Sequence, residues 1–169
     1  RMVAGYCWKW VSKKDGKQCD IKIGEYEVKW NLNSHGQAWI IHPESVSEVG
    51  CIHTCQGLEL DYVGVIIGPD LVVRDGVVKT DFKKRASTDL SLKGIKAIFE
   101  NNPEKAKLAA DKIIKNTYRT LMTRGMKGCY IYSEDKETQD YFKNKLYSNL
   151  EKETTYNNIP TGVSINTDM

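Results

Sequence analysis

The sequence predicts a three-layer α/β domain with a mainly parallel β-sheet. Short runs rich in Val, Ile, Tyr and Trp are separated by segments with helical periodicity, and this alternation is typical of parallel sheets joined by helical crossovers. The chain has 169 residues, of which 40% are hydrophobic, so it can bury one continuous core without cross-links. We expect one domain over residues 1–150 and a polar C-terminal tail over 151–169.

The expected strands follow the short apolar runs. A charged connection separates the first two, and a Gly-containing turn with a short helix over 54–60 separates the next two. The expected strands cover residues 1–10, 37–42, 49–53, 63–67 and 129–132.

An inserted antiparallel hairpin is predicted over residues 71–79. Asp75-Gly76 lies there between two β-branched runs, which is the strongest short-range signal of a two-residue hairpin turn. The hairpin leads into a polar, basic stretch over 79–101, which we expect to be a surface loop. Its run 83–85 is Lys-Lys-Arg, and such a run is either solvated or in contact with nucleic-acid phosphates.

A long helix is predicted to begin at Asn102 as the N-cap, with Pro103 at the first helical position. Apolar residues repeat from there at steps of three and four up to Met122, which predicts one face packed on the sheet. A last amphipathic helix is expected to start after Ser133 as its cap and to carry Tyr141, Phe142, Leu146 and Leu150.

Composition and charge exclude some classes of protein. No apolar run approaches the roughly 18 residues that a membrane span requires. Five cysteines do not suggest a disulfide framework, so we expect a reducing, cytoplasmic compartment. The net charge of +3 neither demands nor forbids a polyanionic partner. Because Arg1 leads directly into an apolar run, we expect the chain to be a piece of a longer protein.

Two sequence segments contain the candidate functional residues. The first is Ile-His-Thr-Cys-Gln-Gly-Leu-Glu-Leu-Asp over 52–61, where polar groups gather at the expected end of a buried strand and backbone N–H groups could face a phosphate. The second ends the long helix in Leu-Met-Thr-Arg-Gly over 121–125. An arginine delivered there could neutralise the charge that develops on a transferred phosphoryl group.

Together these runs resemble motifs V and VI of superfamily-one helicases. The wider pattern, with Ala-Gly-Tyr-Cys-Trp over 4–8 and Thr-Arg-Gly-Met-Lys-Gly over 123–128, looks like an uncharacterised prokaryotic family of P-loop ATPases related to those helicases. The resemblance covers about residues 1–142. It implies a RecA-like fold and the function of a C-terminal motor subdomain in an ATP-dependent nucleic-acid helicase or translocase.

The resemblance also implies roles for individual residues. Arg124 would be the catalytic arginine finger, and Glu59 would contact the nucleotide ribose. Gln56 and Gly57 would line the nucleotide cleft. The residues that would couple this cleft to the nucleic-acid path are His53, Thr54 and Thr123. The sequence departs from the common motifs at Cys55, Met122 and Gly125. These departures leave the arginine intact but weaken the match of the residues next to it.

The sequence lacks the groups that bind the β- and γ-phosphates of ATP. It has no Gly-x-x-x-x-Gly-Lys-Ser/Thr loop and no apolar strand ending in paired acids for Mg²⁺. We therefore expect ATP with Mg²⁺ to be held mainly by an upstream P-loop RecA-like domain of the same chain, with DNA or RNA as a further partner and no membrane.

Several alternatives stand beside these roles. Arg124 could be a cation at a helix C-terminus, Glu59 could cap a short helix, and Gln56 could close a turn. Cys51, His53 and Cys55 alternate along the chain as zinc ligands can, but a fourth ligand is not evident, so core cysteines are the better interpretation and we expect no metal site. The alternative function is a helicase-fold binding or regulatory module that does not hydrolyse ATP.

Overall fold

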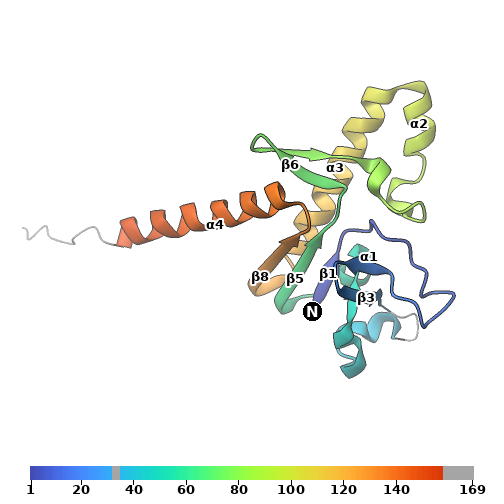
Figure 1. Cartoon of the computed structure of the whole chain (residues 1–169), viewed down its shortest axis with the longest axis horizontal. Coiled ribbons are helices and arrows are strands. Elements are labelled where there is room, and N and C mark those ends of the chain that lie inside the picture. Colours follow the sequence, from blue (N-terminus) through green and yellow to red (C-terminus); the bar gives the residue numbers. More distant parts are fainter. Residues whose placement is uncertain (32–34, 158–169) are drawn as a thin grey trace, which may run out of the picture.

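The computed structural model describes residues 1–31 and 35–157. Its centre is a curled six-stranded sheet with the order β2-β3-β4-β1-β5-β8, and a separate two-stranded sheet pairs β6 with β7 (Figure 1). Within the large sheet all pairings are parallel except β2 with β3. The strands are β1 Met2–Ala4, β2 Ile21–Ile23, β3 Tyr26–Trp30, β4 Glu48–Gly50, β5 Leu60–Ile67, β6 Leu71–Arg74, β7 Val77–Thr80 and β8 Gly125–Ser133.

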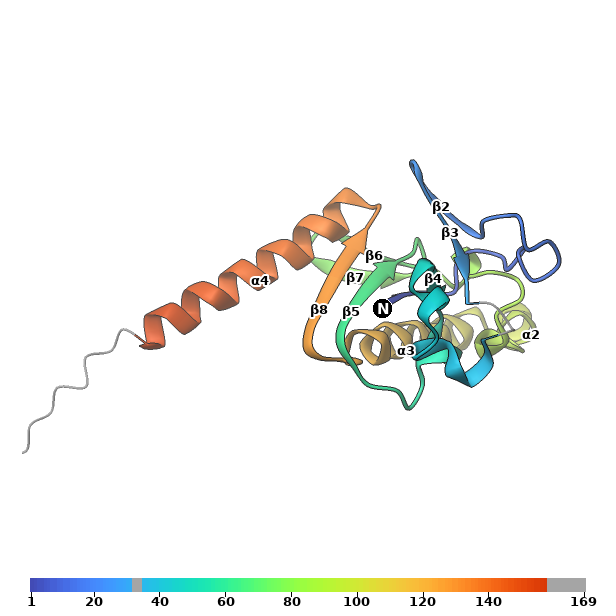
Figure 2. The same cartoon turned by 90° about the horizontal axis from the view of Figure 1, so that it is seen from below.

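Helices and short 3-10 turns connect these strands. The long helix α3 lies beside the sheet, and α4 projects away from the rest of the molecule in both views (Figures 1 and 2). The α-helices are α1 Ile52–Cys55, α2 Ile95–Asn101, α3 Pro103–Met122 and α4 Lys136–Asn157. The 3-10 helices are η1 Gly36–Ile40, η2 Pro43–Ser47, η3 Phe82–Lys84 and η4 Leu90–Leu92.

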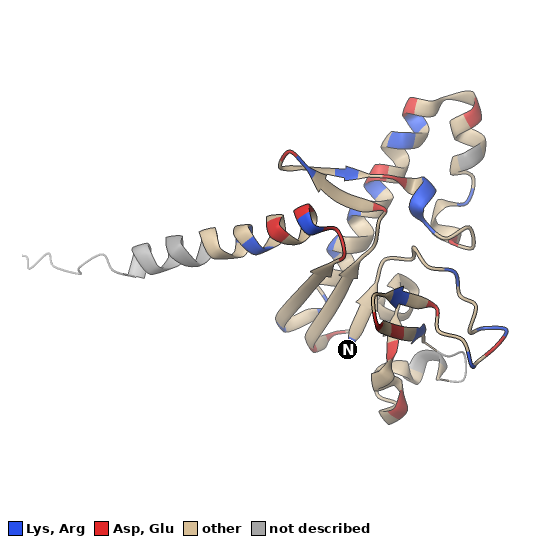
Figure 3. Ribbon diagram, viewed as in Figure 1, with Lys and Arg blue, Asp and Glu red and all other residues tan. Residues whose placement is uncertain are grey.

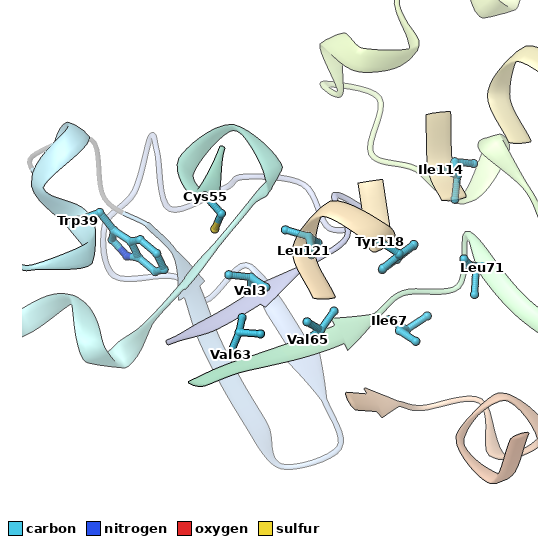
Figure 4. Packing of buried hydrophobic residues seen from close by; sticks show 10 residues of the cluster. All are labelled: Val3, Trp39, Cys55, Val63, Val65, Ile67, Leu71, Ile114, Tyr118 and Leu121. Carbon is cyan, nitrogen blue, oxygen red and sulfur yellow. The ribbon is translucent and has the colours of Figure 1, made fainter. Parts of the chain in front are cut away.

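The core lies between the sheet and α3. Val3, Val63 and Val65 point from the strands toward Tyr118 and Leu121 of the helix (Figure 4). All five side chains are at most 2% exposed, so their apolar surface is almost entirely removed from water. The predicted stripe of α3 therefore packs on the sheet as expected.

The opposite face of the sheet differs from the three-layer prediction. Tyr6 and Trp8, in the segment after β1, pack there with Ile66 of β5. Further along this face Tyr62 and Tyr130 are 52% and 70% exposed. Among the described residues the helices contribute to the first face only, so the second helical layer is not seen in this part of the chain.

Local signals predicted two elements accurately. The side chain of Asn102 accepts a hydrogen bond from the Lys105 backbone N–H at 3.0 Å, which confirms the N-cap of α3. Asp75 and Gly76 both have positive φ, at 56° and 73°, as a two-residue hairpin turn requires. The inserted hairpin is therefore β6 and β7.

The first two strand predictions were wrong in part. Residues 37–42 fall mostly in the 3-10 helix η1, because Trp39 packs into the core from a helical turn and not from a strand. Only residues 2–4 of the run 1–10 pair as a strand. The charged connection between them contains the hairpin β2–β3, whose alternating burial was hidden by its exposed Lys and Glu residues.

The C-terminal helix begins at a different cap from the one predicted. Asp135 and not Ser133 accepts the Thr138 backbone N–H, at 2.9 Å. The helix continues to Asn157, into the segment predicted as a tail, and residues 158–169 lie outside the described residues. Leu150 lies within α4, but the structure describes its backbone only and not its side chain. None of the described helices combines the length and apolarity of a membrane span.

Candidate functional site

The Gln-Gly-Leu-Glu run forms a turn that leads out of α1 and into β5. Gly57 adopts a φ of +78°, which an L side chain rarely does, so glycine suits the turn. The prediction had this turn entering a helix and offering free N–H groups to a phosphate. This expectation was wrong, because α1 precedes the turn. The helix therefore presents its carboxyl end there, with carbonyl groups and not free N–H groups. Gln56 and Glu59 are both exposed.

Arg124 points toward this turn. Its Nη1 donates a hydrogen bond to the Leu58 carbonyl at 3.3 Å, and its Nε donates to the Thr120 carbonyl at 3.1 Å. The backbone joins the same two segments, since the Leu60 N–H donates to the Arg124 carbonyl at 2.8 Å. No hydrogen bond of Nη2 is seen among the described residues. The Nε and Nη1 atoms of the half-buried guanidinium are thus held by backbone carbonyls.

On the other side of the turn lies a cleft of about 900 Å³. His53, Thr54 and Gln56 line it, together with Leu58. His53 is exposed, whereas the Thr54 hydroxyl donates to the Asn31 side-chain oxygen at 2.7 Å and so ties α1 to the end of β3. The structure therefore brings three of the predicted residues together in one cleft.

Three further predicted residues do not line this cleft. Gly57 and Glu59 are exposed in the turn, and Thr123 is exposed at the end of α3. The Thr123 hydroxyl donates to the Arg119 carbonyl at 3.0 Å, so in this conformation it caps the helix. Arg124 likewise lies outside the cleft lining, and its contact with the Leu58 carbonyl connects it to a residue of the cleft.

The β1–β2 connection supplies further cleft residues that were not among the predicted site residues. Lys13 and Lys14 line the cleft with Tyr6 and Trp10, and the Lys13 ammonium lies 5.5 Å from the Trp10 ring. The indole Nε1 of Trp10 is buried without a hydrogen-bond partner among the described residues. Basic residues next to an aromatic one can be recognised in the sequence and are typical of nucleic-acid contacts. Only the fold, however, places these residues opposite α1. Elsewhere, basic and acidic segments alternate along α3 and α4 (Figure 3).

The basic segment 79–101 contributes residues to the cleft wall and is not simply a surface loop. Arg85 is buried, and its guanidinium pairs with Asp70 at 2.9 Å and with Asp89 at 2.6 Å. Burial alone lowers the pKa of Arg85, but the two carboxylates outweigh it, and the net shift is upward. The same pairing places Thr88 and Asp89 in the cleft wall. Arg85 is therefore unavailable to nucleic-acid phosphates.

The alternating cysteines are core residues, as the sequence suggested. Cys51 and Cys55 are 3% and 1% exposed, while His53 faces solvent. Burial raises the pKa of the Cys55 thiol to about 12, which disfavours the thiolate that a zinc ion requires. Among the described residues these three side chains do not form a metal-binding group.

Comparison with known families identifies the chain. Residues 1–135 match the model of the Schlafen group 3, DNA/RNA helicase domain. The chain belongs to this family. It is thus a helicase-related domain, in agreement with the resemblance of its two motifs to those of helicases.

A similar protein is known from yeast. The chain is 28% identical over 143 residues to "Uncharacterized protein YPL245W" of Saccharomyces cerevisiae, an alignment that covers 83% of this chain and 30% of the yeast protein. The chain therefore spans less than a third of that relative. Because this relative is a yeast protein, it gives no support to a prokaryotic origin. No solved structure matches the chain.

Proposed function

We propose that the chain is the second, RecA-like motor domain of an ATP-dependent nucleic-acid helicase or translocase. Membership of a DNA/RNA helicase-domain family supports this function at a coarse level. The mainly parallel sheet, with an arginine at the start of its edge strand β8, is compatible with such a domain.

The proposal depends most on the geometry of Arg124. Its guanidinium contacts the Leu58 carbonyl, so the arginine of one motif lies against the turn of the other, although 66 residues separate them in the chain. Among the described residues its hydrogen bonds run from Nε and Nη1 to two carbonyls, so the Nη2 edge of the fork is the edge proposed to meet a phosphate. A γ-phosphate brought to this edge would form stronger, charge-assisted hydrogen bonds with the same fork. This is the behaviour of an arginine finger that acts on a nucleotide held by another domain.

ATP with Mg²⁺ would be held mainly by an upstream P-loop domain. In this arrangement Arg124 neutralises charge on the transferred phosphoryl group, and exposed Glu59 faces the ribose. Gln56 and Gly57 border the same seam. The present chain supplies no lysine loop, so it completes a nucleotide site and does not form one alone.

The cleft beside the turn is the proposed nucleic-acid path. Lys13 and Lys14 suit backbone phosphates, and the Trp10 ring offers a surface on which a base can stack. His53 and Thr54 line the opposite wall, on α1. Because α1 runs directly into the turn that touches Arg124, a change at the nucleotide could be transmitted to this cleft.

The test uses the full-length protein that contains this domain. We expect Arg124→Ala to lower its nucleic-acid-stimulated ATP turnover by roughly a thousandfold. The matched control is Arg119→Ala, which removes an exposed arginine from the last turn of α3, shortly before Arg124, and should leave turnover nearly unchanged. The isolated chain should hydrolyse no ATP, and sustained turnover by it that Arg124→Ala abolishes would refute the proposal.

The alternative is a binding or regulatory module that does not hydrolyse ATP. The exposed cleft is as compatible with such a module as with a motor, since neither of its walls contains phosphate-binding groups like those of a P-loop. Full-length protein that binds nucleic acid but shows no ATP turnover, with or without Arg124, would select this alternative.

A further inference from the structure

A second cluster of polar side chains lies outside the lining of the cleft, in the connection between β3 and β4. His35 precedes η1, His42 precedes η2, and Glu44 lies within η2. One possible ligand atom from each of the three lies within 4.8 Å of the other two. The two imidazole rings lie 4.1 Å apart between centroids, with 23° between their planes. The two histidines are isolated in the sequence, so their spacing gives no hint of this group.

His35 is oriented by a carboxylate. Its Nδ1 lies 3.1 Å from the side chain of Glu48, and the two side chains are only 8% and 6% exposed. An imidazole whose Nδ1–H bonds to a carboxylate has its lone pair on Nε2, which is then the free ligand atom. Metal-binding histidines usually have such a partner, because it fixes both the tautomer and the direction of the ring.

His42 has a buried nitrogen for which the described residues provide no hydrogen-bond partner. Its Nδ1 is shielded from solvent, and none of the described residues forms a hydrogen bond with it. Buried side-chain nitrogens nearly always have a partner in folded proteins, so this one requires an explanation. The ring of His42 stacks on the other imidazole, and one ligand atom of each ring and of the Glu44 carboxylate lie within 4.8 Å of one another. A cation would satisfy all three groups at once.

We propose that His35, His42 and Glu44 bind a divalent ion of the zinc type, with Glu48 as a positioning residue for His35. Imidazole nitrogens with one carboxylate oxygen suit Zn²⁺, Ni²⁺ or Cu²⁺ better than Mg²⁺ or Ca²⁺. Tetrahedral Zn²⁺ with ligands at about 2.0–2.1 Å places the ligand atoms roughly 3.4 Å apart. Exposed Glu44 can rotate toward the two rings to reach this separation, and it admits the ion from solvent. A water molecule would take the fourth position.

The place of the site separates it from the proposed nucleic-acid path. Glu48 is the first residue of β4, whereas Cys51 and the α1 residues of the cleft follow the last one. The two sites therefore lie at opposite ends of the same strand. An ion here would hold η1 and η2 together and so fix the connection that carries buried Trp39. The proposal does not depend on the motor function.

The alternative is a metal-free arrangement, in which His35 and Glu48 form only a buried ion pair. Calorimetry with Zn²⁺ on the 169-residue chain, after removal of metals by a chelator, distinguishes the two. We expect one Zn²⁺ per chain, together with a rise of the thermal midpoint. Co²⁺ at the same site should give visible absorption bands without the near-ultraviolet band of thiolate ligation, because no cysteine is among the ligands.

Variants make the assignment specific. Glu44→Gln alters an exposed side chain and keeps the fold, and it should weaken Zn²⁺ binding at least tenfold, as should His42→Ala. Glu48→Gln should weaken it by roughly 10–100-fold through His35. The controls are His53→Ala, which removes the remaining histidine, and Cys19→Ser, which removes a thiol near His35; both should bind as the parent does. No saturable binding, or equal affinity in the parent and Glu44→Gln, would overturn the proposal.

Discussion

The hydroxyl of Tyr118 donates a 2.5 Å hydrogen bond to the carboxylate of Asp70, and both side chains are at least 98% buried. The same hydroxyl accepts the Gly68 backbone N–H at 2.8 Å. This pair joins α3 to the turn between β5 and β6. Gly5 is required beside it, because a Cβ at that position would collide with the Tyr118 hydroxyl.

Tyr118→Phe should lower the free energy of unfolding by about 1–3 kcal/mol, because it leaves the Gly68 N–H and one oxygen of Asp70 without partners. Urea denaturation followed by circular dichroism measures this change. Tyr130→Phe is the control, since Tyr130 is 70% exposed and its hydroxyl faces water. Equal stability of the two variants would mean that the buried network contributes nothing.

Arg85→Ala should destabilise the chain more strongly, by about 3–5 kcal/mol, because it leaves the buried carboxylates of Asp70 and Asp89 without their counter-charge. Lys84→Ala removes the exposed neighbouring charge and should change stability by no more than about 0.5 kcal/mol. Denaturant titration of both variants provides the measurement. A small effect of Arg85→Ala would show that the segment 79–101 is not anchored by this pair.

If the cleft takes a nucleic-acid strand, the double variant Lys13→Ala/Lys14→Ala should weaken binding of single-stranded DNA or RNA. The slope of log K against log salt should become shallower by roughly 0.7 for each phosphate that the variant no longer neutralises. Fluorescence anisotropy over a series of salt concentrations reports both quantities. Lys143→Ala/Lys145→Ala removes the same charge from exposed positions on α4, and an equally large effect in this control would argue for non-specific attraction.

Asp135 links stability to pH. Hydrogen bonds from Arg74 and Thr138 hold the pKa of the Asp135 carboxyl well below its ordinary value of 3.8. Because the folded-state pKa is depressed, the ionised carboxylate stabilises the fold above pH 3.8, and this contribution is lost as the pH falls further. Asp135→Asn should therefore lower the thermal midpoint at neutral pH, by an amount equivalent to at most about 1 kcal/mol for this partly exposed pair.

The difference in midpoint between the parent and Asp135→Asn should shrink below pH 3.8. Thermal scans by circular dichroism from pH 7 down to pH 3 test this. Asp140→Asn is the control, because Asp140 is half exposed and its ion pair within the described residues is with Lys136, on the same helix face. A difference that grows as the pH falls would have the wrong sign and would exclude Asp135 as its origin.

Short-range signals explain which elements could be predicted. Asn102 and Pro103 begin α3, and Asp75-Gly76 forms the hairpin turn, because each depends on backbone geometry within a few residues. The strand predicted over 37–42 failed for the opposite reason. Trp39 has a high strand propensity, yet its position in the core selects a 3-10 turn.

The sequence alone determined the two motif runs and the helicase-related family to which they point. It also singled out Arg124 as the candidate arginine finger. The contact between Arg124 and the Leu58 carbonyl, the burial of Arg85 and the meeting of His35 with His42 were decided only by the tertiary structure. The reason is physical. A motif specifies which side chains are present, whereas burial and long-range packing determine which of them become neighbours and which lose their access to water.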